Sequence, residues 1–187
     1  MNQLFTIDCG DIYLREFQVE DVDAIYEITS QPEVYEFLPD WKTSREQRLN
    51  WVTNYEIPSN KSFLAAVPNI EDQRYLRLGI ILKETDEFIG FIYTGIKEGL
   101  PEPNREIAYG ISKHYRNKGY TSKAAKGLIQ YLFENTNVKT LNAVAVIQNV
   151  SSNRVIEKNG FQFQGQVEID NELHNHYTLH KSEWLND

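Results

Sequence analysis

Hydrophobic and polar residues alternate most regularly at residues 106–112. Ile107, Tyr109 and Ile111 are separated by smaller or polar residues, which is the period-two pattern of a β-strand with two different faces. From Ser122 onward the apolar residues change to helical spacing, at Ala124, Ala125, Leu128, Ile129, Leu132 and Phe133. This segment therefore predicts a strand, a short connection and a long helix.

The first thirty residues predict a hairpin followed by a helix. Apolar residues at 4–7 and 12–14 flank a turn at 9–11 that contains a glycine. Helical spacing follows at 22–28, after two acidic residues. We expect this helix to stop before Pro32.

The next helix has a start signal in the sequence. Thr43 and Glu46 have the spacing of a capping box, and Pro58 is expected to end the helix that they open. Residues 32–41, ahead of it, are aromatic-rich and predict an irregular loop. Residues 63–67 form a short apolar run whose type the pattern leaves open.

The remaining apolar runs predict five more strands. They lie at residues 75–83, 88–96, 138–147, 161–169 and 176–184. The polar residues 84–87 predict a hairpin between the first two. Ser151 is expected to cap a short helix that runs to Lys158, and Gly160 suits the left-handed position after it.

Strands that occur in runs and also flank a crossover helix indicate an α+β fold. The expected architecture is a mixed sheet with helices on both faces. The 187 residues suit one domain, spanning 1–187, that is long enough to bury a substantial core. The sequence contains no internal repeat, low-complexity tract or linker.

Composition narrows the class of protein. Hydrophobic residues make up 41% and aromatic residues 12% of the chain, which is typical of a globular protein. A formal net charge of −8 argues against general nucleic-acid binding, which needs an excess of Lys and Arg. The acidic balance is compatible with a cationic substrate such as an amine.

The cysteine count and the hydropathy of the chain predict a cytoplasmic protein. Cys9 is the only cysteine, so no disulfide can form within the chain. We find no signal-peptide pattern and no apolar run near the roughly 18 residues of a membrane span, and therefore expect no membrane association. The histidines lack a carboxylate or cysteine partner at ligand spacing, so we expect no metal site.

The connection between the predicted strand and the long helix has the features of an anion site. Arg116 and Lys118 bring charge, and Gly119 would let the backbone approach a ligand closely. The first N–H groups of a helix have no partner within it, and the helix dipole is positive there, which suits phosphate. A basic loop of this kind is otherwise ordinary solvated surface; the strand before it and the helix after it favour binding.

Three stretches carry a family resemblance. Residues 116–121, RNKGYT, resemble the R-x-x-G-x-[GA] pyrophosphate loop of the GNAT N-acetyltransferases. Residues 149–161, NVSSNRVIEKNGF, resemble the second signature of that family, and the opening LREF at 14–17 is similar to the branch of ribosomal-protein N-terminal acetyltransferases. The matches occur in the expected order along most of the chain.

The resemblance implies a GNAT fold, with a mostly antiparallel sheet of about seven strands and four helices. Two central parallel strands, ending here near Ser112 and Ile147, would splay apart, and acetyl-CoA would enter the gap. The implied activity is transfer of an acetyl group from acetyl-CoA to a primary amine, either a protein N-terminus or a small molecule. Residues 32–41 would border the acceptor pocket, or be a surface loop pinned by buried aromatic side chains.

The resemblance also assigns the residues that would bind acetyl-CoA. The pyrophosphate loop consists of Arg116, Asn117, Lys118, Gly119, Tyr120 and Thr121. The backbone N–H of Ile111 would polarise the thioester carbonyl, freed by a bulge or by the splay. Asn149 would hydrogen-bond the pantetheine arm, although an Asn there also suits a turn.

Two residues are candidates for catalysis. Glu106 would take the proton of the amine directly or through water; the alternative is an exposed glutamate at a strand edge. Ser152 would contact the thiol sulfur, or would share helix capping with Ser151. Tyr177 is a further candidate acid.

The sequence departs from the family pattern at three positions. Ile156 stands where many GNAT enzymes have a tyrosine general acid, Lys123 stands where relatives usually have glutamate, and Thr121 replaces a Gly or Ala. The missing tyrosine motivates a second hypothesis, a non-catalytic acyl-CoA-binding or regulatory module. In either case the expected partners are acetyl-CoA and an amine, without nucleic acid or membrane, and the expected state is a monomer or a homodimer.

Overall fold

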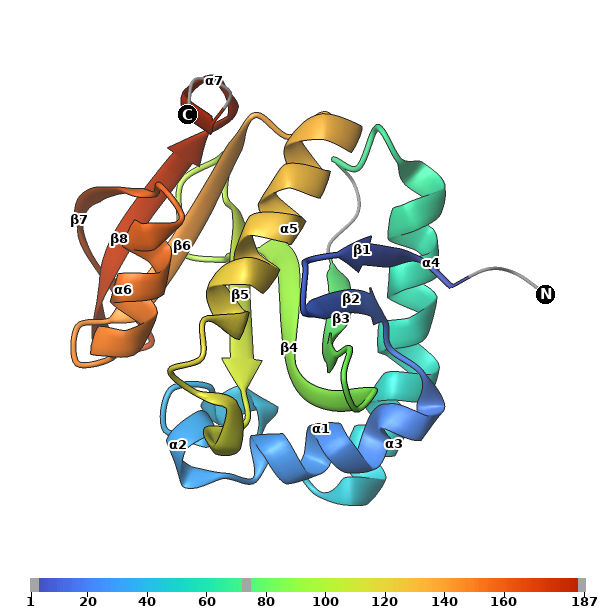
Figure 1. The fold of residues 1–187 in the computed structure, drawn as a ribbon. Helices are drawn as coiled ribbons and strands as arrows, with labels where there is room; N and C mark the ends of the chain where they lie inside the picture. The colour runs from blue at the N-terminus through green and yellow to red at the C-terminus, as the bar shows by residue number, and fades with distance from the viewer. Residues whose placement is uncertain (1–3, 72–74, 185–187) are drawn as a thin grey trace.

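The computed structural model describes residues 4–71 and 75–184 and contains one eight-stranded sheet in the order β1-β2-β3-β4-β5-β6-β8-β7 (Figure 1). The strands are β1 (Thr6–Asp8), β2 (Ile12–Glu16), β3 (Leu76–Leu82), β4 (Glu87–Ile96), β5 (Arg105–Ile111), β6 (Thr140–Val146), β7 (Gln162–Ile169) and β8 (Glu172–His180). All neighbours pair antiparallel except β5 and β6, which are parallel. The predicted mixed sheet is confirmed, with one strand more than the family resemblance implied, because both arms of the N-terminal hairpin join it.

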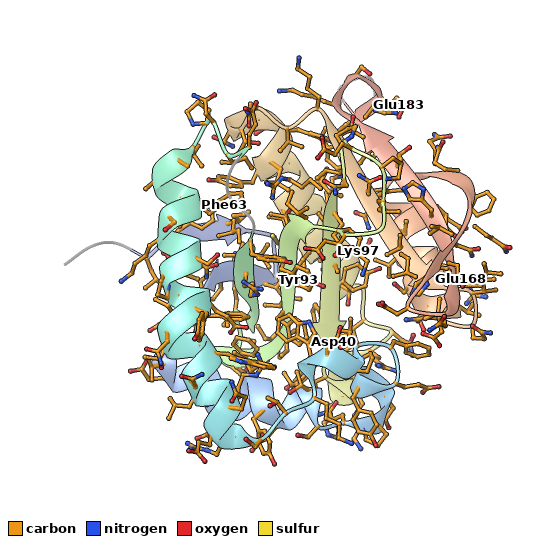
Figure 2. All side chains as sticks on the ribbon, turned by 180° about the vertical axis from the view of Figure 1, so that it is seen from behind. Asp40, Phe63, Tyr93, Lys97, Glu168 and Glu183 are labelled. Atoms are coloured by element: carbon orange, nitrogen blue, oxygen red, sulfur yellow. The ribbon has the colours of Figure 1, made fainter. Side chains whose placement is uncertain are left out.

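Helices cover both faces of this sheet. The α-helices are α1 (Val22–Thr29), α2 (Pro32–Tyr35), α3 (Arg45–Trp51), α4 (Ile57–Ala66), α5 (Tyr120–Asn135), α6 (Val150–Lys158) and α7 (Lys181–Trp184). Single 3-10 turns are η1 (Val19–Asp21), η2 (Pro39–Trp41) and η4 (Lys113–Tyr115), and η3 (Val52–Glu56) is a π-helix. The helix α5 packs on β1, β2 and β5, whereas α1 packs on β4 and β5 and α4 flanks β3 (Figures 1 and 2).

Two clusters of buried side chains hold these layers together. The larger lies between α5 and the sheet and includes Leu128, Leu132 and Phe133, all fully buried. The smaller lies under α1 and contains Ile25 and Phe91. Fully burying one such side chain stabilises the fold by about 1.5–3 kcal/mol, so the helical spacing of the apolar residues fixes which face of each helix meets the sheet.

The prediction that Pro58 ends the second helix is wrong. The helix continues from α3 through η3 into α4, and the apolar run at 63–67 is largely part of α4. Ile57 N–H donates to Val52 O in the i→i−5 pattern of a π-helix, and Pro58 follows in the first turn of α4, where a missing N–H costs least.

Local corrections concern caps and strand ends. Ser44, not Thr43, caps α3, accepting a hydrogen bond from Gln47 N–H at 3.1 Å. Asn149, not Ser151, caps α6. The loop predicted at residues 32–41 contains the short helices α2 and η2, and the last strand ends at His180, where α7 begins.

The two parallel strands separate after a single point of pairing. Glu106 is in register with Asn142, and no other pair joins β5 to β6 within the described residues. The side-chain amide of Asn142 donates to the carbonyls of Pro103 (2.8 Å) and Arg105 (3.1 Å), while its oxygen lies 2.9 Å from His176 Nε2. Asn142 therefore closes one end of the gap between β5 and β6, and the predicted splay is confirmed.

Candidate active site

A cleft of about 600 Å³ opens where β5 and β6 separate. Residues of β5, the loop before α5, the first turns of α6 and the segment 33–38 line it. In Figure 1 this region lies between the C-terminal end of β5, α6 and α2. Most of the residues assigned to the site from the sequence meet here.

The loop before α5 has the backbone of an anion-binding turn. Asn117 and Gly119 both adopt left-handed conformations, with φ of 61° and 81°, and Gly119 is the N-cap of α5. The first N–H groups of α5 have no intrahelical acceptor. A Cβ at Gly119 would meet no atom within 4 Å, so open space lies beside these amides, and the loop fits the pyrophosphate of acetyl-CoA.

Side chains of two segments bring positive charge to the cleft. Arg116 lines it and donates a hydrogen bond to the carbonyl of Glu33. Arg154 and Lys158 line it from α6, at i and i+4, and the sequence analysis missed both. Both lie within the second signature, on one face of α6, but the sequence did not show that this face meets the cleft.

Two lysines near the loop point elsewhere. The ammonium of Lys118 lies 5.1 Å from the centre of the Tyr115 ring, and its side chain is not part of the cleft wall. Lys123, which departs from the family pattern, forms an exposed ion pair with Asp11 at 2.7 Å. The presence of lysine instead of glutamate at position 123 therefore leaves the cleft unchanged.

The backbone N–H of Ile111 faces the gap. Ser112 N–H donates to Ile89 O at 2.9 Å, and hydrogen-bonding direction alternates along an antiparallel strand, so the N–H of Ile111 points away from β4 toward β6. There the strands have already separated. The splay and not a bulge therefore frees this N–H, because β4 and β5 pair without a register shift; the register shifts lie between β3 and β4 and between β7 and β8.

Glu106 lines the cleft near its closed end. It is only 6% exposed, so the alternative of a solvent-exposed strand-edge glutamate is wrong. Burial raises the pKa of Glu106 to about 7, and Lys97 opposes that rise. A carboxyl group with such a pKa can take up and release a proton near neutral pH.

Ser152 meets a phenol that the sequence analysis did not assign. Its Oγ lies 3.1 Å from the hydroxyl of Tyr109, which also donates to Ser152 O at 3.2 Å. Burial raises the pKa of Tyr109, so the phenol stays protonated and can donate. Ser152 N–H donates to Asn149 Oδ1 at 3.2 Å, so Asn149 caps the helix and Ser152 does not.

The remaining candidates lie outside the reacting region. Tyr177 donates to Asn153 Oδ1 at 2.8 Å and to Glu157 at 3.3 Å, and it does not line the cleft, so the prediction that it could reach the site is wrong. His174 lines the cleft, whereas His176 is bound to Asn142. Within residues 4–71 and 75–184, no group of three His, Cys, Asp or Glu side chains is arranged to hold a metal ion.

A splayed parallel pair, a buried carboxylate at its closed end and a glycine-capped anion loop are the features of an acyl-CoA-dependent acyltransferase. The family model described as "Acetyltransferase (GNAT) domain" matches residues 11–162, and the chain therefore belongs to the GNAT family. It is an acetyl-CoA-dependent N-acetyltransferase, which confirms the enzyme class predicted from the loop and the second signature.

Curated relatives extend over most of the chain. The N-acetyltransferase YnaD of Bacillus subtilis is 27% identical over 154 residues, covering 82% of this chain and 81% of its own. The ribosomal-protein-serine acetyltransferase of Escherichia coli is 27% identical over 165 residues, covering 86% of this chain and 90% of its own.

Solved structures share the fold. A GNAT acetyltransferase from Bacillus anthracis superimposes with a TM-score of 0.76 at 23% identity, covering 96% of this chain and 100% of its own. The aminoglycoside acetyltransferase AAC(6')-Ib, in complex with paromomycin and acetyl-CoA, superimposes with a TM-score of 0.73 at 16% identity, covering 94% and 97%. None of the helices in the described part of this chain is long and apolar enough to cross a membrane.

Proposed function

We propose that Glu106 is the general base for acetyl transfer to a primary amine. An alkyl ammonium has a pKa of roughly 10 and must lose a proton before its nitrogen can attack a thioester. Glu106 lines the cleft and has a pKa raised to about 7, so a basic carboxylate is present near neutral pH. The burial of this carboxyl group at the closed end of the gap is the observation that carries the proposal.

The donor binds along the opposite part of the cleft. The amides of residues 116–121 hold the pyrophosphate, and the guanidinium of Arg116 adds charge. Arg154 and Lys158 face the same space, which supports a polyanionic ligand. Asn149 binds the pantetheine arm through its side-chain NH₂ group, because its oxygen accepts the capping hydrogen bond.

The transfer step uses four groups of the chain. The acceptor nitrogen bonds to the acetyl carbon while the carbonyl oxygen accepts a hydrogen bond from Ile111 N–H. The C–S bond then breaks, and the hydroxyls of Ser152 and Tyr109 stabilise the leaving thiolate by donation. Glu106 holds the proton taken from the ammonium until solvent removes it, and the thiolate takes up the second proton, which the nitrogen loses as the amide forms.

The acceptor is a primary amine, of a protein N-terminus or of a small molecule. The names of the relatives support both, since one is a ribosomal-protein-serine acetyltransferase and another a probable spermine N(1)-acetyltransferase. The enzyme acts in the cytoplasm, as a monomer or a homodimer, without binding nucleic acid or a membrane. The formal charge of −8 supports the exclusion of nucleic acid.

An unbiased screen tests this function. Thiol release from acetyl-CoA is followed over a panel of amines and peptides, and coenzyme A binding is measured in parallel by calorimetry. Release with at least one amine class, abolished by omitting the amine, is expected. Tight binding without turnover of any acceptor would instead favour the non-catalytic module.

A further inference from the structure

A second hollow of about 460 Å³ is lined by residues of η2, α3, η3, β3 and β4 and shares one wall with the cleft. That wall is Tyr93, which among the described residues alone lines both spaces; its side chain is labelled in Figure 2. Aromatic side chains form much of the lining: Trp41, Trp51, Tyr55, Tyr75 and Tyr93. Trp41 stacks on Phe91 at 4.0 Å and on Tyr93 at 5.6 Å, which holds the Tyr93 ring in place beside the hollow and the cleft.

Two guanidinium groups share one carboxylate in this hollow. Glu56 Oε1 lies 3.2 Å from Arg48 Nη1 and 3.7 Å from Arg77 Nε. The side chains of Arg48 and Glu56 are 1% and 8% exposed. Burial raises the pKa of Glu56 and so disfavours the negative charge of this buried carboxylate, whereas the two arginines oppose the rise. Asp40 also lines the hollow but is exposed, so the less exposed part of the lining holds two guanidinium groups against the single carboxylate of Glu56.

The guanidinium of Arg77 keeps its hydrogen-bonding capacity. Among the described residues it donates no hydrogen bond within 3.5 Å; it lies over the Tyr75 ring at 4.3 Å and lines the hollow. A planar guanidinium is suited to bidentate binding of a carboxylate.

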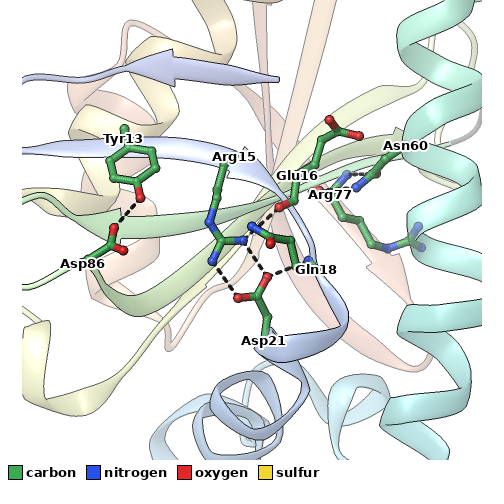
Figure 3. Close-up of polar contacts among 8 residues, drawn as sticks. All are labelled: Tyr13, Arg15, Glu16, Gln18, Asp21, Asn60, Arg77 and Asp86. Atoms are coloured by element: carbon green, nitrogen blue, oxygen red, sulfur yellow. Dashed lines mark hydrogen bonds and ion pairs between the residues drawn. The ribbon is translucent and has the colours of Figure 1, made fainter. Parts of the chain in front are cut away.

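The backbone around this group is held firmly. The strand β2 ends opposite Leu78, so the peptide of Arg77 has no strand partner on that side. Asn60 replaces it, with hydrogen bonds of 2.7 Å to Arg77 N–H and to Arg77 O (Figure 3). Glu56 ends the π-helix η3, an uncommon element that occurs frequently at functional sites.

Tyr93 stands between Arg77 and the proposed base. Arg77, Tyr93 and Ala108 are in register across β3, β4 and β5, and Glu106 is two residues from Ala108 on the same face. Charged groups on both sides of Tyr93 affect its phenol. Burial and the Glu106 carboxylate raise the pKa of Tyr93, and Arg77 opposes this rise.

We propose that the second hollow binds a carboxylate of the acceptor through Arg77, while the acceptor amine lies at Glu106 on the other side of Tyr93. The inference rests on the proposed function and specifies its substrate class, an amine that carries an anionic group. Aromatic walls keep water from this pair and strengthen it. Polycationic acceptors would place a second ammonium against the excess positive charge and are disfavoured.

Matched acceptors test the proposal in the intact enzyme. Thiol release is measured for ω-amino acids of increasing chain length, their primary amides, and the corresponding diamines. At one chain length, kcat/KM should be at least about tenfold higher for the acid than for its amide, and lowest for the diamine. Equal rates for acid and amide, or a preference for the diamine, would overturn the inference and leave the transferase function intact.

Variants separate recognition from chemistry. Arg77→Gln should raise KM for the acid by about tenfold or more with kcat nearly unchanged and should not affect the amide. The KM of Arg77→Lys for the acid should lie between those of the parent and of Arg77→Gln, because lysine keeps the charge but lacks the planar guanidinium. Arg45→Gln, which breaks an exposed ion pair with Asp23, is the control and should change neither acceptor. If Arg77→Gln fails to fold, the lysine variant and the acid-to-amide ratio of the parent decide.

A binding measurement needs no turnover. The tryptophan fluorescence of the enzyme with bound coenzyme A is titrated with alkanoates that lack an amine, taking advantage of Trp41 and Trp51 in the hollow. A saturable change that Arg77→Gln weakens supports the carboxylate site, even if every amine in the screen proves inactive. A titration that is unaffected by Arg77→Gln contradicts it.

Discussion

Gly119 combines a left-handed backbone with an open position beside the helix amides. Gly119→Val should weaken coenzyme A binding severely, because φ of 81° strains a β-branched residue and the new side chain enters the ligand's space. Calorimetry measures the affinity. Gly99→Val is the matched control, since Gly99 has φ of 92° with open space around it but does not line the cleft, and it should bind as the parent does.

Arg116→Ala complements this variant, since it removes charge without straining the loop. It should weaken binding moderately and make the affinity less dependent on salt. Parental affinity in Gly119→Val would show that the loop does not bind the pyrophosphate.

Ser152→Ala should lower turnover more than it lowers thermal stability. The hydroxyl bonds Tyr109 across the cleft, whereas the cap of α6 is supplied by Asn149. Asn149→Ala should cost about 1 kcal/mol of stability as a lost cap. Thermal melting and thiol release are compared for both variants; a Ser152→Ala protein that melts earlier but turns over normally would return this hydroxyl to a structural role.

The sequence could identify Glu106 and the loop because each stands at a fixed place relative to a motif or a strand end. Tyr109 was visible only as part of the period-two pattern, since its contact with Ser152 is made 43 residues away along the chain. Arg154 and Lys158 could not be assigned to the cleft until the rotation of α6 about its axis was known.

At the scale of elements, Asn142 sets where β5 and β6 begin to separate. Asn142→Leu removes its hydrogen bonds to the carbonyls of Pro103 and Arg105 and to His176. Water should then reach Glu106, and its pKa should fall from about 7 toward the ordinary carboxylate value. The acid limb of the pH–kcat profile should move to lower pH, along with a loss of stability.

Asn153→Leu provides the comparison for this variant. Asn153 is also buried and binds the carbonyl of Val146, but at the open end of β6. The Asn153→Leu variant should be less stable than the parent, but the acid limb of its pH–kcat profile should stay at the same pH. An unchanged limb in Asn142→Leu would mean that this clasp does not control the hydration of Glu106.

The spacing of apolar residues and the turn residues located most helices and strands, but the prediction that one helix ends at Pro58 was wrong. The rule that proline ends a helix assumes an uninterrupted i→i−4 ladder, and the π-helix at Val52–Glu56 breaks that assumption just before Pro58. The sequence carried no signal for this change of hydrogen-bonding pattern.

At the scale of the whole molecule, the burial of Glu106 makes this carboxylate more basic and lowers the stability of the fold. When folding raises the pKa of a carboxyl group, ionisation of that group disfavours the folded state. The free energy of unfolding therefore decreases as the pH rises from the unfolded pKa near 4.5 to the folded pKa near 7. Glu106→Gln removes this dependence. Urea unfolding should show the variant gaining on the parent from pH 5 to pH 8, by at most about 3 kcal/mol. A constant difference would indicate that Glu106 is hydrated in the folded enzyme.

The overall topology could be inferred because the order of strands and helices matches one family, whereas the position of the acceptor depends on the whole assembly. The second hollow brings together η2, α3, η3, β3 and β4, with Trp41 and Arg77 far apart in the chain. No local pattern links such residues, and they are recognised only once the sheet has set Arg77 beside Tyr93.

The pH dependence of kcat/KM in the parent and in Glu106→Gln tests the mechanism most directly. An alkyl amine acceptor arrives as an ammonium at neutral pH, so the base is needed, and raising the pH should partly rescue the variant because more of the amine is then neutral. The parent should show an acid limb near pH 7, and the variant should be slower by roughly 10² to 10⁴-fold at neutral pH, without that limb and with nearly unchanged coenzyme A affinity. A variant that turns over at the parental rate at pH 7, with the same acid limb, would contradict the assignment of Glu106 as the base.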